Sequence, residues 1–465
     1  MSRRLALLLI LAVSLAPLAM AGDWLKFPAY KRTLLPNGVT LLVMEKHSAP
    51  LISISVVLKS GSVQDPAGQE GLADITNALL RKGAGQRSAQ QIAEDVDFIG
   101  ATLATNASYE STNVRTEFLK KDLTTGLDIL RDLLLHPTFP QEEVDKILKQ
   151  RADGLKAAKD NPQGVMGWYY NDFLFGAHPY ARPSGGTELS VAGIKREDIV
   201  RFHEQNYVSG NIIISVCGDL QTAEMEKLLT ARFGALPKKS APAVSVPKPQ
   251  PVSGVKLLFI DKPDATQTFF RFGNVGIARN DPDRAAVDII NTLFGGRFTS
   301  RINTALRIDS GLTYGANSFF DRRKQPGPFV ISSYTRNATT EKALDMALDI
   351  LKELHEKGFT EAQLASARAY IKGQFGPEVE TSDQLANLMA EFEIYGLDAK
   401  EVDEYAARLD AVTMADARRV IEKDFPSKNL VFTIIGKGSE VGALMKKYAP
   451  QVETRSISDP GFGKK

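Results

Sequence analysis

The order of predicted strands and helices is repeated within this chain, and a proline-rich stretch separates the two copies. Residues 238–254 carry prolines at positions 242, 247, 249 and 251, a spacing that neither a helix nor a central strand tolerates. Each copy closes with a helix followed by an apolar strand, at 195–218 and again at 414–436. The repetition predicts two homologous domains. The predicted divisions are a domain at 24–237, a linker at 238–254, a domain at 255–452 and a polar tail at 453–465.

Within each copy, short stretches that alternate apolar and polar residues are followed by longer stretches of helical spacing. In the first copy, residues 33–45 and 51–59 alternate in this way around an Asn37-Gly38 turn, which is typical of a hairpin of half-buried strands. Residues 123–135 and 142–159 instead have the apolar spacing of amphipathic helices. We therefore predict an α+β fold in which each domain is an antiparallel-rich mixed sheet packed with helices.

The first residues have the pattern of a secretory signal peptide. Arg3 and Arg4 precede an apolar run from Leu5 to about Leu18, and Ala19-Met20-Ala21 supplies an A-x-A cleavage site. The run is too short for a membrane-spanning helix, and the sequence after it contains none that is long enough. If the source is bacterial, residues 1–21 predict a periplasmic or secreted protein without a membrane anchor.

Composition excludes two further classes of protein. The chain has 57 basic and 55 acidic residues, so it has no strong net field to attract nucleic acid. Its one cysteine, Cys217, cannot form a disulfide within the chain, and its stability must therefore come from a large apolar core.

A short helix predicted at 71–83 presents two different faces. Leu72, Ile75 and Leu79 recur at helical spacing and form an apolar face. Asp74, Asn77 and Arg81 lie on another face, which is where chemistry would take place.

Three segments that include this helix resemble the pitrilysin/insulinase family of zinc peptidases, to which the mitochondrial processing peptidase belongs. They are Leu35-Pro36-Asn37-Gly38-Val39-Thr40-Leu41, the run from Val57 to Ser62, and Gly71-Leu72-Ala73. In that family the helix carries His-x-x-Glu-His. Two histidines four residues apart lie on one helix face and bind Zn²⁺, while the glutamate activates the metal-bound water.

In this chain the resemblance places Asp74, Asn77 and Ala78 at the positions of that motif. Alanine cannot bind a metal and asparagine cannot act as a general base, so the motif is degenerate. The family's third ligand, a glutamate, would fall near Ala152-Asp153-Gly154-Leu155, where no glutamate stands. We therefore expect this chain to bind no metal or other cofactor and to be inactive as a peptidase on its own.

A second motif of the family survives in the second copy. An arginine and a tyrosine seven residues apart reach the substrate in family members, and Arg307 and Tyr314 match that spacing and its sequence context. A guanidinium and a phenol can donate hydrogen bonds to peptide carbonyls and stabilise a developing oxyanion. The alternative is that Arg307 forms a surface ion pair with Asp309 or Asp283 and that Tyr314 packs in the core.

The histidines and the Gly295-Gly296 pair do not predict a further functional site. The five histidines are scattered, and none forms a pair at helical spacing, so a new metal site built from them is not expected. Gly295 and Gly296 are interpreted as a tight turn between helices, because no Lys-Ser or Lys-Thr pair follows them to bind phosphate.

The resemblance implies a function as one of two subunits. In bacterial two-subunit members one chain brings the zinc motif and the other brings the arginine and tyrosine, and the two close as a clamshell. This chain would be the second kind, with zinc in a homologous partner subunit and a peptide or unfolded polypeptide as substrate. In the family an edge strand of the sheet receives the substrate as an added strand. The alternative for this strand is that it is only part of the sheet scaffold. The alternative is a peptidase-like binding or scaffold protein without any catalytic role.

Overall fold

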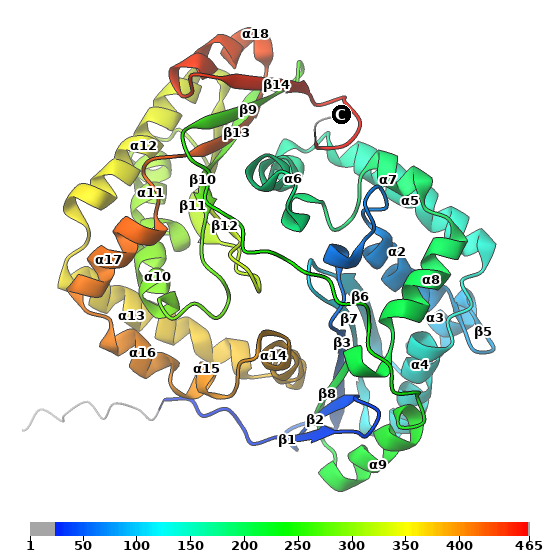
Figure 1. The fold of residues 1–465 in the computed structure, drawn as a ribbon. Helices are drawn as coiled ribbons and strands as arrows, with labels where there is room; N and C mark the ends of the chain where they lie inside the picture. Colours follow the sequence, from blue (N-terminus) through cyan, green and yellow to red (C-terminus); the bar gives the residue numbers. More distant parts are fainter. Residues whose placement is uncertain (1–23, 464–465) are drawn as a thin grey trace, which may run out of the picture.

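The computed structural model describes residues 24–463, in which two six-stranded sheets dominate (Figure 1). The predicted signal peptide at 1–21 lies outside the described residues. The helices and strands of the first half are β1 (Lys31–Leu34), β2 (Thr40–Glu45), β3 (Leu51–Leu58), α2 (Leu72–Leu79), β4 (Gly83–Ala84), β5 (Arg87–Ser88), α3 (Ala89–Phe98), β6 (Thr102–Ala107), β7 (Thr112–Leu119), α4 (Leu123–Leu135), α5 (Gln141–Ala158), α6 (Pro162–Phe175), α7 (Glu188–Gly193), α8 (Arg196–Asn206), β8 (Ile212–Gly218) and α9 (Thr222–Phe233).

Residues 234–255, all of them described, form neither helix nor strand, and they include the proline-rich stretch. The elements of the second half are β9 (Lys256–Asp261), β10 (Gln267–Val275), α10 (Arg284–Asn291), α11 (Arg301–Asn303), β11 (Ala316–Phe320), β12 (Pro328–Arg336), α12 (Thr340–Lys357), α13 (Glu361–Phe375), α14 (Ser382–Tyr395), α15 (Lys400–Asp403), α16 (Tyr405–Ala411), α17 (Met414–Asp424), β13 (Val431–Gly436), α18 (Gly438–Val441) and β14 (Val452–Ser456).

The two sheets repeat one strand arrangement. The first has the order β1-β2-β8-β3-β7-β6, and the second, taken in the same direction, has the order β14-β9-β13-β10-β12-β11. Each contains a parallel pair at the same place, β2 with β8 and β9 with β13, and the homologous pairs beyond it are antiparallel. This confirms the predicted α+β class, with two mixed, antiparallel-rich sheets packed with helices.

The strand at 51–58 departs from the predicted hairpin. The Asn37-Gly38 turn does join β1 to β2, but β8 lies between β2 and β3. Both β2 and β3 are buried on both faces rather than half-buried, and Ser53 and Ser55 of β3 are fully buried. The physical reason is α14, a helix of the second half, which packs against β3 and β8.

The two halves exchange one helix each. While α14 covers the first sheet, α6 of the first half packs against β10 and β13 of the second sheet, and Figure 1 shows both helices between the two lobes. Tyr170 of α6 is fully buried in one cluster with Val330 and Val431 of that sheet. Because each helix buries apolar surface against the opposite half, the relative position of the two sheets is fixed by two large apolar contacts.

The segment 453–465, predicted to be a polar tail, is instead largely ordered in its described part, residues 453–463. Val452–Ser456 forms β14, which pairs in parallel with β9 at the edge of the second sheet. Phe462 is 1% exposed, and its ring lies 4.9 Å from the ring of Trp168 and 5.1 Å from that of Tyr169. Backbone pairing holds this segment despite its polar side chains, and one phenylalanine anchors it on α6.

The turn between β11 and β12 is fixed against the first half. Arg323 is 4% exposed, with its guanidinium 3.6 Å from the ring centre of Tyr109 and 4.6 Å from that of Tyr180. Glu110 accepts hydrogen bonds from the Tyr180 hydroxyl and from the Lys324 N–H, the latter at 2.9 Å. Edge strand β11 is therefore held at a set place relative to the first sheet.

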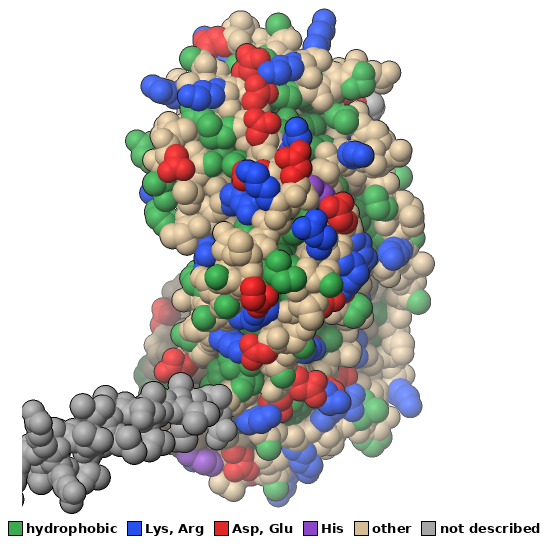
Figure 2. Space-filling model, turned by 90° about the vertical axis from the view of Figure 1, so that its left-hand side faces the viewer, with side chains coloured by type: hydrophobic (Ala, Val, Ile, Leu, Met, Phe, Trp, Pro, Cys, Tyr) green, Lys and Arg blue, Asp and Glu red, His purple; other side chains and the backbone are tan. Residues whose placement is uncertain are grey.

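The outer surface has no dominant sign of charge on the face in Figure 2, where basic and acidic side chains are interspersed. This agrees with the near balance of 57 basic and 55 acidic residues in the whole chain. Within residues 24–463, none of the helices combines the length and the apolar character that crossing a bilayer requires.

Candidate functional site

The helix at the degenerate motif is α2, and its apolar face is buried as predicted. Leu72, Ile75 and Leu79 belong to the apolar core of the first half. Gly71 precedes the helix at φ +97°, a conformation that favours glycine, and Asp65 caps the helix by accepting the N–H groups of Gly71 and Ala73, each at 2.8 Å. This cap fixes where the polar face of α2 begins.

Asp74, on that polar face, is paired with an arginine. Arg151 of α5 donates a hydrogen bond to Asp74 Oδ2. Burial raises the pKa of the Asp74 carboxyl, while the Arg151 charge and a hydrogen bond from the Ala107 N–H oppose that rise. A fixed cation therefore occupies the surroundings of the first motif position.

Asn77 is committed to the sheet. It is fully buried, and its Nδ2 donates to the carbonyl oxygens of Asn106 at 2.8 Å and Asn113 at 3.3 Å, which lie on the paired strands β6 and β7. The Tyr207 hydroxyl donates to Asn77 Oδ1 at 3.3 Å. The amide thus connects α2 to the edge of the first sheet and has a structural role.

Ala78 and Gly154 line one small cavity of about 290 Å³, together with Arg151, Leu155 and Trp168. The two positions that the resemblance assigns to a metal ligand on α2 and on α5 are therefore neighbours in space. A zinc ion would find a methyl group, a glycine and a guanidinium here, and this donor set does not fit it. Among residues 24–463, no three His, Cys, Asp or Glu side chains gather closely enough to hold a metal ion.

Arg307 lies in a π-helical turn, Thr304–Asp309, that follows α11. Such turns are rare and are frequently found at functional sites. Gly311 then reverses the chain at φ +62°, and the Leu312 N–H donates to the Leu306 carbonyl at 2.9 Å. The strand that follows, β11, begins at Ala316, two residues after Tyr314.

Side chains of the second sheet hold this loop in place. Thr335 Oγ1 donates to the Leu312 carbonyl at 2.7 Å, and Ser333 Oγ donates to the Gly315 carbonyl at 2.9 Å. Asn303 accepts from the Ala316 N–H at 3.1 Å and donates to the Phe298 carbonyl at 2.6 Å. The backbone that carries Arg307 and Tyr314 is thus tied to β12 and to α11.

Neither Arg307 nor Tyr314 follows the alternative reading. Tyr314 is 78% exposed and is not packed in the core. Asp283 is paired with Arg419 and Lys423, each at 2.7 Å. Within residues 24–463, no carboxylate lies within 4.0 Å of the Arg307 guanidinium, which instead lies 4.8 Å from the ring centre of Phe298. The charge of Arg307 is uncompensated.

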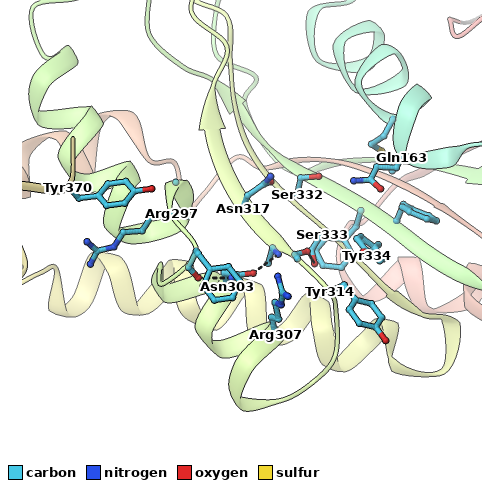
Figure 3. A pocket seen from close by; sticks show the side chains of 18 residues that line it. Gln163, Arg297, Asn303, Arg307, Tyr314, Asn317, Ser332, Ser333, Tyr334 and Tyr370 are labelled. Atoms are coloured by element: carbon cyan, nitrogen blue, oxygen red, sulfur yellow. Dashed lines mark hydrogen bonds between the residues drawn. The ribbon is translucent and has the colours of Figure 1, made fainter. Parts of the chain in front are cut away.

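Both residues line a cavity of about 490 Å³ between the two halves of the chain. Figure 3 shows the Arg307 guanidinium directed toward Ser333, with Tyr314 beside it and its hydroxyl turned away from the other labelled residues. The lining residues are Gln163, Met166, Phe269, Phe270, Gly295, Gly296, Arg297, Phe298, Asn303, Arg307, Tyr314, Gly315, Ala316, Asn317, Ser332, Ser333, Tyr334 and Tyr370. A volume of this order suits a ligand or several residues of a peptide.

The structure does not bring the two sets of predicted residues together. Among the described residues, the linings of the Ala78 cavity and the Arg307 cavity have no member in common. Helix α6 lies between them, with Trp168 in the first cavity and Gln163 and Met166 in the second. The sequence analysis also missed Arg151, Arg297 and Tyr370, which belong to one or the other site.

Gly295 allows the backbone of its helical segment to approach strand β11 closely, in addition to forming the predicted turn between helices. It lies in the π-helical segment Thr292–Gly296, where an added Cβ would stand 2.3 Å from Ser318 Oγ and 2.4 Å from Ser318 N. Asn291 reinforces the contact by donating to the Ser318 carbonyl at 3.1 Å. The segment therefore closes one side of the cavity by direct contact with β11.

Comparison with known proteins agrees with these features. Residues 40–187 match the family model described as insulinase, peptidase family M16, and residues 193–371 match the one described as the peptidase M16 inactive domain. This chain belongs to the insulinase family of peptidases. The match of residues 193–371 to the inactive-domain model supports a peptidase-like, non-catalytic member of the insulinase family.

Individual relatives in the insulinase family show the same extent of similarity. An uncharacterized zinc protease of Mycobacterium leprae is 25% identical over 392 residues, which cover 82% of this chain and 86% of the relative. The crystal structure of a peptidase M16 inactive domain from Pseudomonas fluorescens is 26% identical, with a TM-score of 0.83, covering 88% of this chain and 98% of that one. The first half of the periplasmic protease PqqL from Escherichia coli shares the fold at 15% identity, with a TM-score of 0.73, covering 92% of this chain and 98% of that one.

Proposed function

We propose that this protein is the metal-free subunit of a periplasmic zinc peptidase, in which Arg307 and Tyr314 bind the peptide that a zinc-bearing partner subunit cleaves. The observation that carries the proposal is the uncompensated guanidinium of Arg307 beside the exposed Tyr314 at the mouth of a 490 Å³ cavity. Because Arg307 is exposed and has no carboxylate partner within residues 24–463, all of its donors can bind a ligand.

The chemistry of the two side chains suits a peptide carbonyl. The guanidinium and the phenol are both hydrogen-bond donors, and they can bind carbonyl oxygens beside the scissile bond. The same donors would stabilise the oxyanion that forms when water attacks the peptide. The attacking water must be activated by the partner, because the α2 site of this chain does not fit zinc.

Exposed side chains near the cavity favour the binding of a partner subunit over it. Phe298, Ile308 and Tyr314 are 59%, 53% and 78% exposed, and all three lie within one segment of the chain. Phe298 and Tyr314 both line the cavity, and two large exposed side chains at one site favour contact with another protein or a ligand. A partner subunit that closes over this face as the second half of a clamshell would bury them together with the substrate.

The cellular location follows from the predicted signal peptide at 1–21, which would direct the chain to the periplasm of a bacterium. The similarity in fold to the first half of a periplasmic protease also suits a unit that works with a second, comparable unit.

Reconstitution tests this function. The chain without residues 1–21 is co-expressed with a homologue from the same genome that carries His-x-x-Glu-His, and each is also prepared alone. We expect a stable complex that hydrolyses an unfolded polypeptide, with zinc in the homologue and no hydrolysis by this chain alone. Hydrolysis by this chain alone would contradict the proposal. A chain that binds unfolded polypeptide but adds nothing to the homologue's activity would instead be a binding or scaffold protein.

A further inference from the structure

A second arginine in the Arg307 cavity has no assigned role. Arg297 lines the same cavity, and none of the described residues that line it is Asp or Glu. Figure 3 shows Arg297 and Tyr370 on one side of Asn303, with Arg307 and Tyr314 on the other. The lining of the cavity thus contains two arginines and, among the described residues, no carboxylate to balance them.

Arg297 is held in position but not neutralised. It follows Gly296 at the end of the π-helical segment, and its guanidinium lies 5.8 Å from the ring centre of Tyr370 on α13. Nη1 donates to Ser366 Oγ at 3.2 Å. Its Nε is buried and, among residues 24–463, has no hydrogen-bond partner. An aromatic ring and a hydroxyl orient this side chain, and its positive charge has no carboxylate partner within residues 24–463.

Three other arginines of the second half form ion pairs with carboxylates. Arg279 pairs with Glu391 at 2.7 Å, Arg284 with Glu401, and Arg322 with Asp288. Carboxylates thus balance these three guanidinium groups. Within residues 24–463, Arg297 and Arg307 have no carboxylate within 4.0 Å, and the same holds for Arg271 and Arg301 outside the cavity.

We infer that Arg297 binds a carboxylate of the peptide that occupies this cavity, so that the site selects peptides with an acidic side chain or a free C-terminus near the bound segment. This inference rests on the proposed function, because it assigns the class of substrate to the same site. A guanidinium matches a carboxylate with two parallel hydrogen bonds, and Arg307 is then left for the peptide carbonyls.

Direct binding tests the inference without the partner subunit. Four short fluorescein-labelled peptides share one sequence of alanine and serine and differ in two features, glutamate or glutamine at the central position and a free or amidated C-terminus. Fluorescence anisotropy at low salt should show about tenfold or tighter binding for a peptide with a carboxylate than for the amidated glutamine peptide. Whichever carboxylate gives the preference identifies its source.

Two variants decide which residue is responsible. Arg297→Gln should remove the preference, and Arg336→Gln, at an exposed arginine outside the cavity, should keep it. Equal binding of all four peptides, no binding of any, or a preference that persists in Arg297→Gln would overturn the inference. Because hydrolysis is not measured, a carboxylate preference in this assay together with an inactive reconstituted pair would reject the proposed function alone.

Discussion

Arg151 on α5 donates a hydrogen bond to Asp74 on α2, the first residue that the sequence analysis assigned to the family's zinc motif. The side chains are 32% and 19% exposed, so the pair is largely shielded from water. The Arg151–Asp74 ion pair thus joins helices α5 and α2.

Removal of Arg151 should destabilise the fold. In Arg151→Ala the Asp74 carboxylate loses its partner in a poorly hydrated place, and we expect the free energy of unfolding to fall by about 1–3 kcal/mol. Urea unfolding measures this. The control is Arg201→Ala, whose arginine pairs with Asp198 but is 57% exposed, and it should cost at most about 1 kcal/mol. Equal effects of the two substitutions would refute a structural role for the inner pair.

Restoring the family's glutamate should harm rather than help this chain. In Asn77→Glu a carboxylate replaces an amide that donates to the carbonyls of Asn106 and Asn113. The buried carboxylate oxygens would then face these carbonyl oxygens with no hydrogen to share. We expect a loss of at least about 2 kcal/mol in urea unfolding. Gln363→Glu, at an exposed capping position of α13, makes a comparable change and should shift stability by no more than about 0.5 kcal/mol. A neutral Asn77→Glu would contradict the packing described here.

The contact between Gly295 and β11 is expected to exclude any side chain. Gly295→Ala places a Cβ against Ser318 and should lower the free energy of unfolding by about 1–3 kcal/mol. The reason is that the Ser318 backbone nitrogen, one of the atoms it would meet, is fixed in β11 and cannot move away. Gly373→Ala, inside α13 with no atom within 4 Å of the new Cβ, should be neutral or stabilise by up to about 1 kcal/mol. Thermal unfolding of both variants compares them, and similar melting temperatures would argue against a close approach.

His203 should make stability depend on pH. Burial lowers its pKa from 6.5 to about 4, and its Nε2 donates to the Leu134 carbonyl at 2.9 Å. Between these two values the unfolded chain binds a proton that the folded chain does not, so stability falls as pH drops from 6.5 toward 4. The loss amounts to about 3 kcal/mol in total. His203→Leu should reduce this dependence in urea unfolding at several pH values, and an unchanged slope would show that other groups cause it.

The sequence was sufficient for the fold class but not for the exchange of helices. The amphipathic helices α4 and α5 have clear periodicity, and their predicted bounds of 123–135 and 142–159 agree with the observed ones within one residue. By contrast, α6 contacts both halves, and its apolar and aromatic residues are spread around the helix, so it has no single apolar face to detect. The sequence patterns also did not predict α14, the helix that the second half packs on the first sheet, and therefore did not predict the burial of Ser53 and Ser55.

The candidate sites show a similar division. The spacing of Arg307 and Tyr314 could be recognised in the sequence, but only the structure shows that one is uncompensated and the other exposed. Arg151 lies far from Asp74 along the chain, and nothing local marks them as partners. Long-range ion pairs of this kind depend on how helices pack, which single-sequence patterns do not encode.

The central claim is that Arg307 acts on the substrate in a complex with a zinc-bearing subunit. The most direct measurement compares peptide hydrolysis by the reconstituted pair containing Arg307→Gln with that of the unaltered pair, under conditions where both complexes are shown to be assembled. Loss of one such donor should lower kcat by about 10²–10³-fold. The melting temperature should not change, because Arg307 is exposed and has no carboxylate partner within residues 24–463. Arg336→Gln should leave the rate unchanged. An Arg307→Gln pair that hydrolyses the peptide at the unaltered rate would contradict the account.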